Sequence, residues 1–205
     1  MKRRLYVAYG SNLNLAQMTY RCPRAKLLGT GVINGYELQF KGFPSSAYAT
    51  IAPKEGASVP VGVWEIQSSD EHSLDRYEGY PSHYFKENIP VQMQDGSEVK
   101  GMVYIMNQRM KFGLPSTHYY KVVHQGYLDC GLDTQVLNEA VQASAGRYYE
   151  NVTSEQQYRQ LSVLSEEMEE EESFEDDEDF DDEEDMGEED LDDDEEMDYS
   201  GGMQF

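Results

Sequence analysis

The chain carries, close to its start, the sequence LYVAYGSNL (residues 5–13). Residues 5–9 form a short β-prone run that stops at Gly-Ser-Asn, and residues 14–21 have the pattern of a helix. The sequence therefore predicts a strand, a tight loop and the start of a helix. Backbone N–H groups at such a junction point outward and, with the helix dipole, favour a carboxylate or a phosphate. Gly-Ser-Asn is equally typical of an ordinary turn and helix N-cap.

Further strands are predicted where Val, Ile, Tyr and Phe are frequent and Gly, Pro or Asp-Gly separates the runs. These segments are residues 25–40, 47–53, 58–66, 84–93 and 98–106. Helical patterns occupy residues 69–77, 116–129 and 134–143. Many short strands interleaved with few helices predict a small α+β domain of barrel-like architecture.

The formal net charge of −24 is unevenly distributed along the 205 residues. Residues 1–165 hold all 16 Lys and Arg and 15 of the 40 Asp and Glu, so this part is nearly neutral. The remaining acids follow without a single basic residue, and such a segment cannot bury enough apolar surface to offset its ordering entropy. We therefore predict a domain over residues 1–150, a linker over 151–165 and a disordered Asp/Glu-rich tail over 166–205.

Apolar residues interrupt the acidic tail at a regular spacing. Met168, Phe174, Phe180 and Met186 are each six residues apart, so an extended chain would place them on one face. This pattern makes the tail a candidate for docking to a protein partner. A solvated, solubilising tail with incidental apolar residues explains the same sequence.

Composition also argues against several classes of partner. No basic patch large enough to follow a nucleic-acid backbone is present, and the tail would repel phosphates. No apolar run approaches the roughly 20 residues of a membrane span, and the run after the basic start is too short for a signal peptide. Cys22 and Cys130 lack metal-ligand spacing, which suggests free thiols. We expect a cytoplasmic protein with no metal, no nucleic acid and no membrane partner.

A second motif, LDRYEGYP at residues 74–81, places a lone glutamate after a helical turn, among aromatic residues and before Gly and Pro. A carboxyl group in aromatic and apolar surroundings has its charged form disfavoured, so its pKa rises towards neutrality. Glu78 is thus a candidate proton shuttle. Taken alone, the same pattern fits a surface glutamate before a turn.

Together the two motifs resemble the γ-glutamylcyclotransferase family. The resemblance rests on YGSNL at residues 9–13, ATI at 49–51, VGVW at 61–64 and LDRYEGY at 74–80, and on matching residues of a C-terminal helix. Those last residues are Ser116, Tyr119, Gly126, Gly131 and Leu132. Order, spacing and residue type agree over residues 3–145, whereas the acidic tail lies outside the family pattern.

The resemblance implies a mixed β-barrel with flanking helices, and an enzyme that needs neither metal nor cofactor. The α-amine of a γ-glutamyl compound would attack its own γ-carbonyl, releasing 5-oxoproline and an amine or amino acid. Glu78 would be the general acid/base. The substrate would be held by a loop and by pocket-lining tyrosines, which are Tyr9, Gly10, Ser11, Asn12, Leu13, Tyr84, Tyr104 and Tyr119.

Two other functions remain open from the sequence. The tail could be a handle for protein modification or interaction, because isopeptide chemistry on its γ-carboxyls would create γ-glutamyl linkages. The domain could also be a binding module that kept the fold and lost the reaction, although the intact Glu78 and loop argue against this. The leaving amine, the pathway and the oligomeric state do not follow from the residues.

Overall fold

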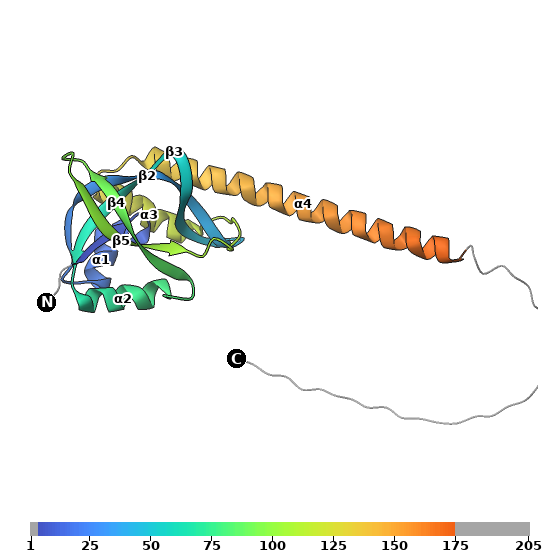
Figure 1. Ribbon diagram of the computed structural model, residues 1–205, viewed down its shortest axis with the longest axis horizontal. Helices are drawn as coiled ribbons and strands as arrows, with labels where there is room; N and C mark the ends of the chain where they lie inside the picture. Colours follow the sequence, from blue (N-terminus) through green and yellow to red (C-terminus); the bar gives the residue numbers. More distant parts are fainter. Residues whose placement is uncertain (1–3, 175–205) are drawn as a thin grey trace, which may run out of the picture. The chain divides into compact units, whose positions relative to one another are not determined.

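A closed β-barrel of mixed strand direction forms the centre of the computed structural model, which describes residues 4–174 (Figure 1). The strands pair in the order β1-β3-β2-β4-β5, and all pairs are antiparallel except β1 with β5. Their bounds are β1 Arg4–Ala8, β2 Lys26–Phe43, β3 Ser46–Ile66, β4 Tyr84–Met93 and β5 Glu98–Met106. The predicted mixed β-barrel with flanking helices is confirmed.

The β2–β3 hairpin is longer than the sequence predicted. Residues 47–53 and 58–66, predicted as separate strands, belong to the single strand β3, which pairs with β2 along its length. The pairing register shifts between Asn34 and Tyr36, and Gly35 and Gly56 have left-handed φ values of 77° and 75°. These glycines let the strands bend at the shift without ending, so the glycine signal marked a bulge and not a break.

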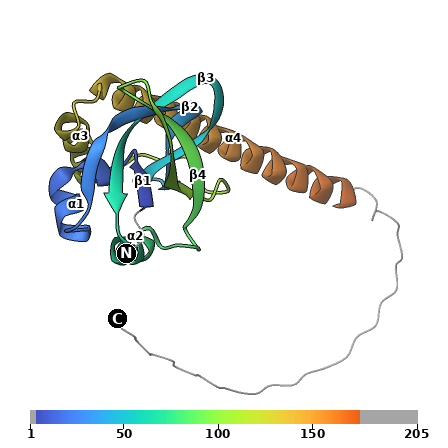
Figure 2. The ribbon, with the colours of Figure 1, turned by 60° about the vertical axis from the view of Figure 1, so that its left-hand side comes forward.

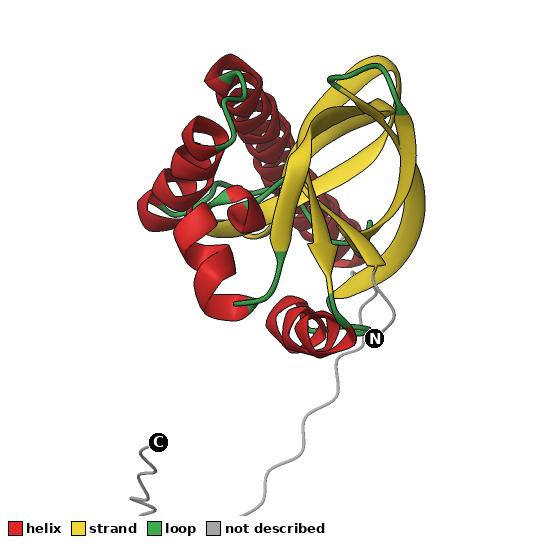
Figure 3. Ribbon diagram, turned by 90° about the vertical axis from the view of Figure 1, so that its left-hand side faces the viewer, coloured by secondary structure: helices red, strands yellow, loops and turns green. Residues whose placement is uncertain are grey.

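Helices cover the outside of the barrel (Figures 2 and 3). They are the 3-10 turn η1 Ser11–Leu13, α1 Leu15–Arg21, α2 Ser68–Glu78, α3 Thr117–Asp129 and α4 Thr134–Phe174. Asn14 caps α1 by accepting from the backbone N–H of Gln17, and Ser116 caps α3 in the same way with Tyr119. Buried Leu13, Met18 and Tyr127 join these helices to the barrel core.

Helix α4 corrects the predicted helix end at Ala143, because it continues to Phe174. Residues 151–165, predicted as a linker, lie within this helix. Residues 144–174 contain no Pro and a single glycine, Gly146. They are rich in Glu and Gln, which are good helix formers. Contacts divide the chain into residues 1–159, which include the barrel, and residues 160–205. Residues 175–205, with most of the predicted acidic tail, lie outside the described residues.

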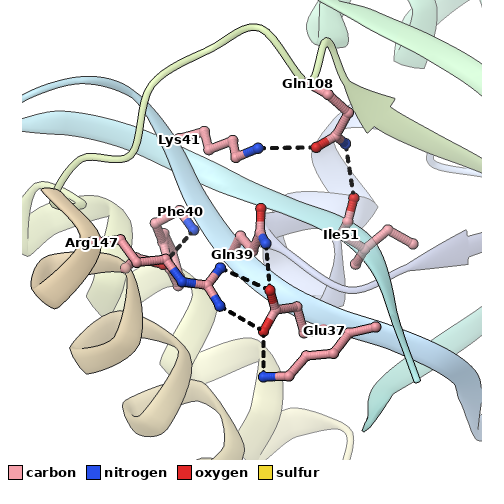
Figure 4. A network of polar contacts seen from close by, with 9 residues as sticks. Glu37, Gln39, Phe40, Lys41, Ile51, Gln108 and Arg147 are labelled. Carbon is pink, nitrogen blue, oxygen red and sulfur yellow. Dashed lines mark hydrogen bonds and ion pairs between the residues drawn. The ribbon is translucent and has the colours of Figure 1, made fainter. Parts of the chain in front are cut away.

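A polar network ties the first part of α4 to β2 (Figure 4). Arg147 donates to both carboxylate oxygens of Glu37 at 2.8 and 3.3 Å, Lys54 donates at 2.7 Å, and Ser144 Oγ accepts from the Phe40 N–H at 2.9 Å. Burial opposes ionisation of Glu37, but the hydrogen bonds from Arg147 and Lys54 lower its pKa to about 2. The helix is therefore anchored by contacts between residues more than 100 positions apart.

Candidate active site

A cavity of about 550 Å³ lies beside the loop after β1 and the C-terminal end of α2. Its walls also include parts of the β2–β3 hairpin, β5 and α3. Eight of the nine predicted site residues line it: Tyr9, Gly10, Ser11, Asn12, Glu78, Tyr84, Tyr104 and Tyr119. The fold thus brings together residues that are up to 110 positions apart in the sequence.

Leu13 is the exception, because it does not line the cavity. Its side chain is fully buried, and its backbone N–H donates to the carbonyl oxygen of Gly10 at 3.0 Å. The turn η1 closes on itself through this bond. That N–H is therefore engaged within the turn, and the contact of Leu13 with a substrate stays a prediction.

Gly10 lies where the loop passes closest to the neighbouring walls of the cavity. A Cβ atom at this position would come within 3.2 Å of Ala49 Cβ and 3.3 Å of the Tyr119 hydroxyl. These distances are shorter than ordinary carbon contacts, so a larger residue would push Tyr119 or the hairpin away from the loop. Glycine at this position therefore allows the loop to approach these walls closely.

Glu78 is the last residue of α2, and Gly79 ends the helix in the left-handed conformation with φ of 63°. The carboxyl is partly buried in the cavity wall, and its Oε1 accepts from Asn12 Nδ2 at 2.9 Å. Burial raises the pKa of Glu78 to about 7, against the opposing effects of the Arg21 charge and the Asn12 hydrogen bond. Near neutral pH this group can both accept and return a proton.

Arg21 is a site residue that the sequence reasoning missed. Its Nη1 donates to Asn12 Oδ1 at 2.6 Å and to Ser11 Oγ at 3.2 Å, and its guanidinium carbon lies 3.6 Å from the centroid of the Tyr77 ring. The helix starting at the loop places Arg21 over it, and the i, i+4 spacing to Gln17 was the available signal.

Four cavity tyrosines differ in what their hydroxyl groups do. Tyr9 donates to the carbonyl of Tyr104 at 2.6 Å, and Tyr104 in turn donates to Asp75 Oδ1 at 2.6 Å. Tyr84 donates to the carbonyl of Ala49 at 3.0 Å.

Tyr119 has the opposite role, since its hydroxyl oxygen accepts from the N–H of Ala49 at 3.2 Å. Its own proton is therefore not used in that bond. Burial raises the pKa of Tyr119, and of Tyr84, well above the ordinary value, so both hydroxyls stay protonated.

Other lining residues come from the β2–β3 hairpin and from the segments before β4 and after β5. Phe43 and Tyr48 of the β2–β3 hairpin and Met110 after β5 add apolar surface to the cavity wall, and His83 and Asn107 add polar groups. In residues 4–174, no group of three or more His, Cys, Asp or Glu side chains could hold a metal ion. Over the same residues, no helix is long and apolar enough to cross a membrane.

Comparisons with known proteins agree with this geometry. Residues 6–127 match the family model described as gamma-glutamyl cyclotransferase, AIG2-like. The chain is 32% identical to human gamma-glutamylcyclotransferase over 136 residues, covering 62% of this chain and 72% of that protein. It is 30% identical to the mouse protein over 160 residues, covering 74% and 84%.

A solved structure of a gamma-glutamyl cyclotransferase superposes with a TM-score of 0.63 and 28% identity, covering 68% of this chain and 86% of that one. A second structure, a human protein described as uncharacterized, gives a TM-score of 0.63 and 29% identity, covering 68% and 87%. The family model covers more than half of the chain and includes both the loop and Glu78. The chain therefore belongs to the gamma-glutamyl cyclotransferase, AIG2-like family of enzymes.

Proposed function

We propose that this protein cyclises the glutamyl part of a small γ-glutamyl compound, releasing 5-oxoproline and a free amine or amino acid, with Glu78 as general acid/base. One observation carries the proposal. Glu78 has a pKa of about 7, lies in the wall of a cavity and is hydrogen-bonded to the glycine loop that the family model includes.

The reaction needs a base because the α-amine of the substrate, with a pKa near 8, is mostly protonated at neutral pH. Ionised Glu78 takes one proton from the α-ammonium, and the freed nitrogen attacks the γ-carbonyl carbon. The five-membered ring closes through a tetrahedral oxyanion whose ring nitrogen still carries two protons. Glu78 gives its proton to the leaving nitrogen, and the bond from the γ-carbon to that nitrogen breaks as the oxyanion collapses. The ionised carboxylate then takes the second proton from the ring nitrogen and passes it to the departing amine. No water is consumed and the carboxyl ends in its starting state.

The two oxygens of Glu78 have different surroundings. Within residues 4–174, Asn12 is the hydrogen-bond partner of this carboxyl, and the bond is made to Oε1. We assign Oε2 to the α-ammonium of the substrate. A carboxyl held at one oxygen and free at the other keeps its orientation while it exchanges a proton.

The glutamyl α-carboxylate fits the loop formed by Gly10, Ser11 and Asn12, which all line the cavity. The Ser11 hydroxyl and the positive charge of Arg21 behind it favour an anion at this position. Binding the carboxylate here and the ammonium at Glu78 would fold the glutamyl chain so that its two ends meet. Such positioning is the main task in an intramolecular reaction.

Tyr119 is the hydroxyl that we assign to the oxyanion. Its oxygen accepts from Ala49, so its proton remains for the substrate, whereas the hydroxyl proton of Tyr84 is committed to the carbonyl of Ala49. A donor held in place before the reaction stabilises developing negative charge without reorganisation.

The test is 5-oxoproline release by the full chain from a panel of γ-glutamyl amino acids and γ-glutamylamines. Native protein and the exposed-strand control Glu98→Gln should release product, with kcat/KM rising with pH through about 7 as Glu78 ionises. Glu78→Gln should be inactive with its fold preserved. No release from any member of the panel by native protein, or full activity of Glu78→Gln, would refute the proposal.

A further inference from the structure

Arg21 donates to the loop residues Ser11 and Asn12, and Asn12 in turn donates to the Glu78 carboxyl. Its guanidinium reaches Asn12 Oδ1 at 2.6 Å, Ser11 Oγ at 3.2 Å and Gln17 Oε1 at 2.7 Å. The flat group is also stacked on the Tyr77 ring, with 3.6 Å between its carbon and the ring centroid. This combination of fork-shaped donation and stacking is specific to arginine.

The hydrogen bonds of Asn12 explain why the Arg21 contact matters. The carboxamide has one acceptor oxygen and one NH2 group with two donors. Nδ2 donates to Tyr6 at 2.7 Å and to Glu78 at 2.9 Å, and Oδ1 accepts from Arg21. A carboxamide rotated by 180° would turn its oxygen towards the Glu78 carboxylate, which would be repulsive. The cation next to Oδ1 selects the orientation that donates to Glu78.

We propose that Arg21 is a positioning residue for Glu78: it fixes the Asn12 carboxamide with its NH2 group towards the carboxyl, and it supplies the positive charge that favours the ionised base. It does not touch the reacting atoms in this arrangement. The proposal rests on the proposed function only for its catalytic consequence. The effect on Glu78 itself is a property of the folded protein.

The other groups around Glu78 leave this role to Arg21. Buried tyrosines surround the carboxyl, and burial raises the pKa of Tyr6, Tyr9 and Tyr84 well above the ordinary value, so they are neutral at pH 7. Lys86, the nearby cation on β4, is paired with Glu71 and Asp75 at 2.7 and 2.6 Å. The remaining titratable or charged cavity residues are Tyr48, Arg76, Tyr77, His83, Tyr104 and Tyr119.

Arg21 and Asn12 both favour the charged form of Glu78, whereas burial disfavours it. Without Arg21 the carboxyl would lose a nearby positive charge and the fixed N–H donor together, so its pKa would rise further. Glu78 would then be protonated, and unable to act as a base, over a larger part of the pH range around 7. Arg21 thus keeps the carboxyl able to act at neutral pH despite its burial.

The experiment is a direct titration of the Glu78 carboxyl in the full chain by NMR with 13C-labelled glutamate, with the signal assigned by its loss in Glu78→Gln. Three variants are compared. Arg21→Met removes both the positive charge and the guanidinium hydrogen-bond donors, and Arg21→Lys keeps the charge but removes the guanidinium group. Arg24→Met is the control. Arg24 is exposed and three residues further on, so its replacement is a matched loss of one charge.

The Glu78 midpoint should rise by at least about half a pH unit in Arg21→Met and by less in Arg21→Lys, and it should stay unchanged in Arg24→Met. Should Arg21→Met fail to fold, Arg21→Lys decides by the same measurement. An unchanged midpoint in a folded Arg21 variant, or an equal rise in Arg24→Met, overturns the proposal.

This readout is independent of turnover. If native protein releases no 5-oxoproline but the midpoint rises as expected, the proposed function fails and the role of Arg21 stands. If the protein is active and the Glu78 midpoint does not move in the Arg21 variants, the proposed function stands and the role of Arg21 fails. In an active protein, the acidic limb of kcat/KM should move to higher pH together with the NMR midpoint.

Discussion

Gly126 of α3 packs directly on the backbone of Asn14, so closely that a Cβ atom on Gly126 would lie 2.6 Å from the Asn14 nitrogen and 2.7 Å from Leu13 Cβ. No real Cβ atom tolerates such contacts with backbone, so a side chain here would move α3 or the loop. The loop that carries Ser11 and Asn12 is therefore held in place by a helix more than 100 residues away in the sequence.

Gly126→Ala should destabilise the protein by about 1–3 kcal/mol, because overpacking outweighs the helix propensity that alanine gains. Gly146→Ala is the matched control, since Gly146 is also helical and its Cβ would meet nothing within 4 Å. This second variant should be stabilised by about 0.5–1 kcal/mol. Urea unfolding of both variants checks the pair, and equal effects would contradict the packing argument.

Tyr119→Phe and Tyr84→Phe form a second matched pair, because both hydroxyls bond to the backbone of Ala49. Each change removes one such bond and should cost about 1 kcal/mol of stability. Of these two hydroxyls, Tyr119 is the one with a proton left for the oxyanion, so Tyr119→Phe should lower kcat by about 10²–10³-fold. Tyr84→Phe should lower kcat much less. Comparable kcat losses in the two variants would argue against the assignment.

The sequence located the cavity residues better than the residues that hold them in place. Glu78 and the Gly-Ser-Asn loop were predicted because the type of these residues, between a strand and a helix or before Gly and Pro, carries local information. Arg21 was missed because its role depends on which way the Asn12 carboxamide points. That orientation exists only in the folded protein.

The errors in the predicted strand and helix ends also arise from contacts that form only in the folded protein. Gly56 and its neighbours predicted a strand break, but pairing with β2 keeps β3 continuous through the bend. The last helix was predicted to end at Ala143, directly before Ser144 and Arg147, whose partners Phe40 and Glu37 lie far away in the sequence. Local patterns cannot report such long-range contacts. The barrel was recovered because its alternating strands and turns are local signals.

Removal of residues 166–205 should leave the domain folded and active. The cavity and its walls lie between Tyr6 and Tyr119, and the network that anchors α4 ends at Arg147. We expect a cooperative thermal transition within a few degrees of that of the full chain, and the same kcat/KM on any active γ-glutamyl substrate. Loss of the transition or of activity on truncation would show that the acidic segment supports the domain.

Replacing Glu78 should stabilise the protein at high pH while it removes activity. The folded-state pKa is raised from 4.5 to about 7, so below pH 4.5 the carboxyl is protonated in both the folded and the unfolded states. Between these values the folded protein holds a proton that the unfolded chain has released, so stability falls as pH rises. Above pH 7 the loss of folding stability is complete, and the pKa shift of Glu78 sets the upper limit of this loss at about 3 kcal/mol.

Glutamine has nearly the shape of a protonated glutamate and carries no charge, so Glu78→Gln escapes this penalty. The free energy of unfolding of the variant, relative to native protein, should therefore rise between pH 4.5 and 7 and level off above 7. Urea unfolding at pH 4.5, 6 and 8 measures this difference, and Glu98→Gln, on an exposed part of β5, should show no such rise. A pH-independent difference for Glu78→Gln would mean that the carboxyl ionises in the folded protein as easily as in the unfolded chain, and the acid/base assignment would lose its physical basis.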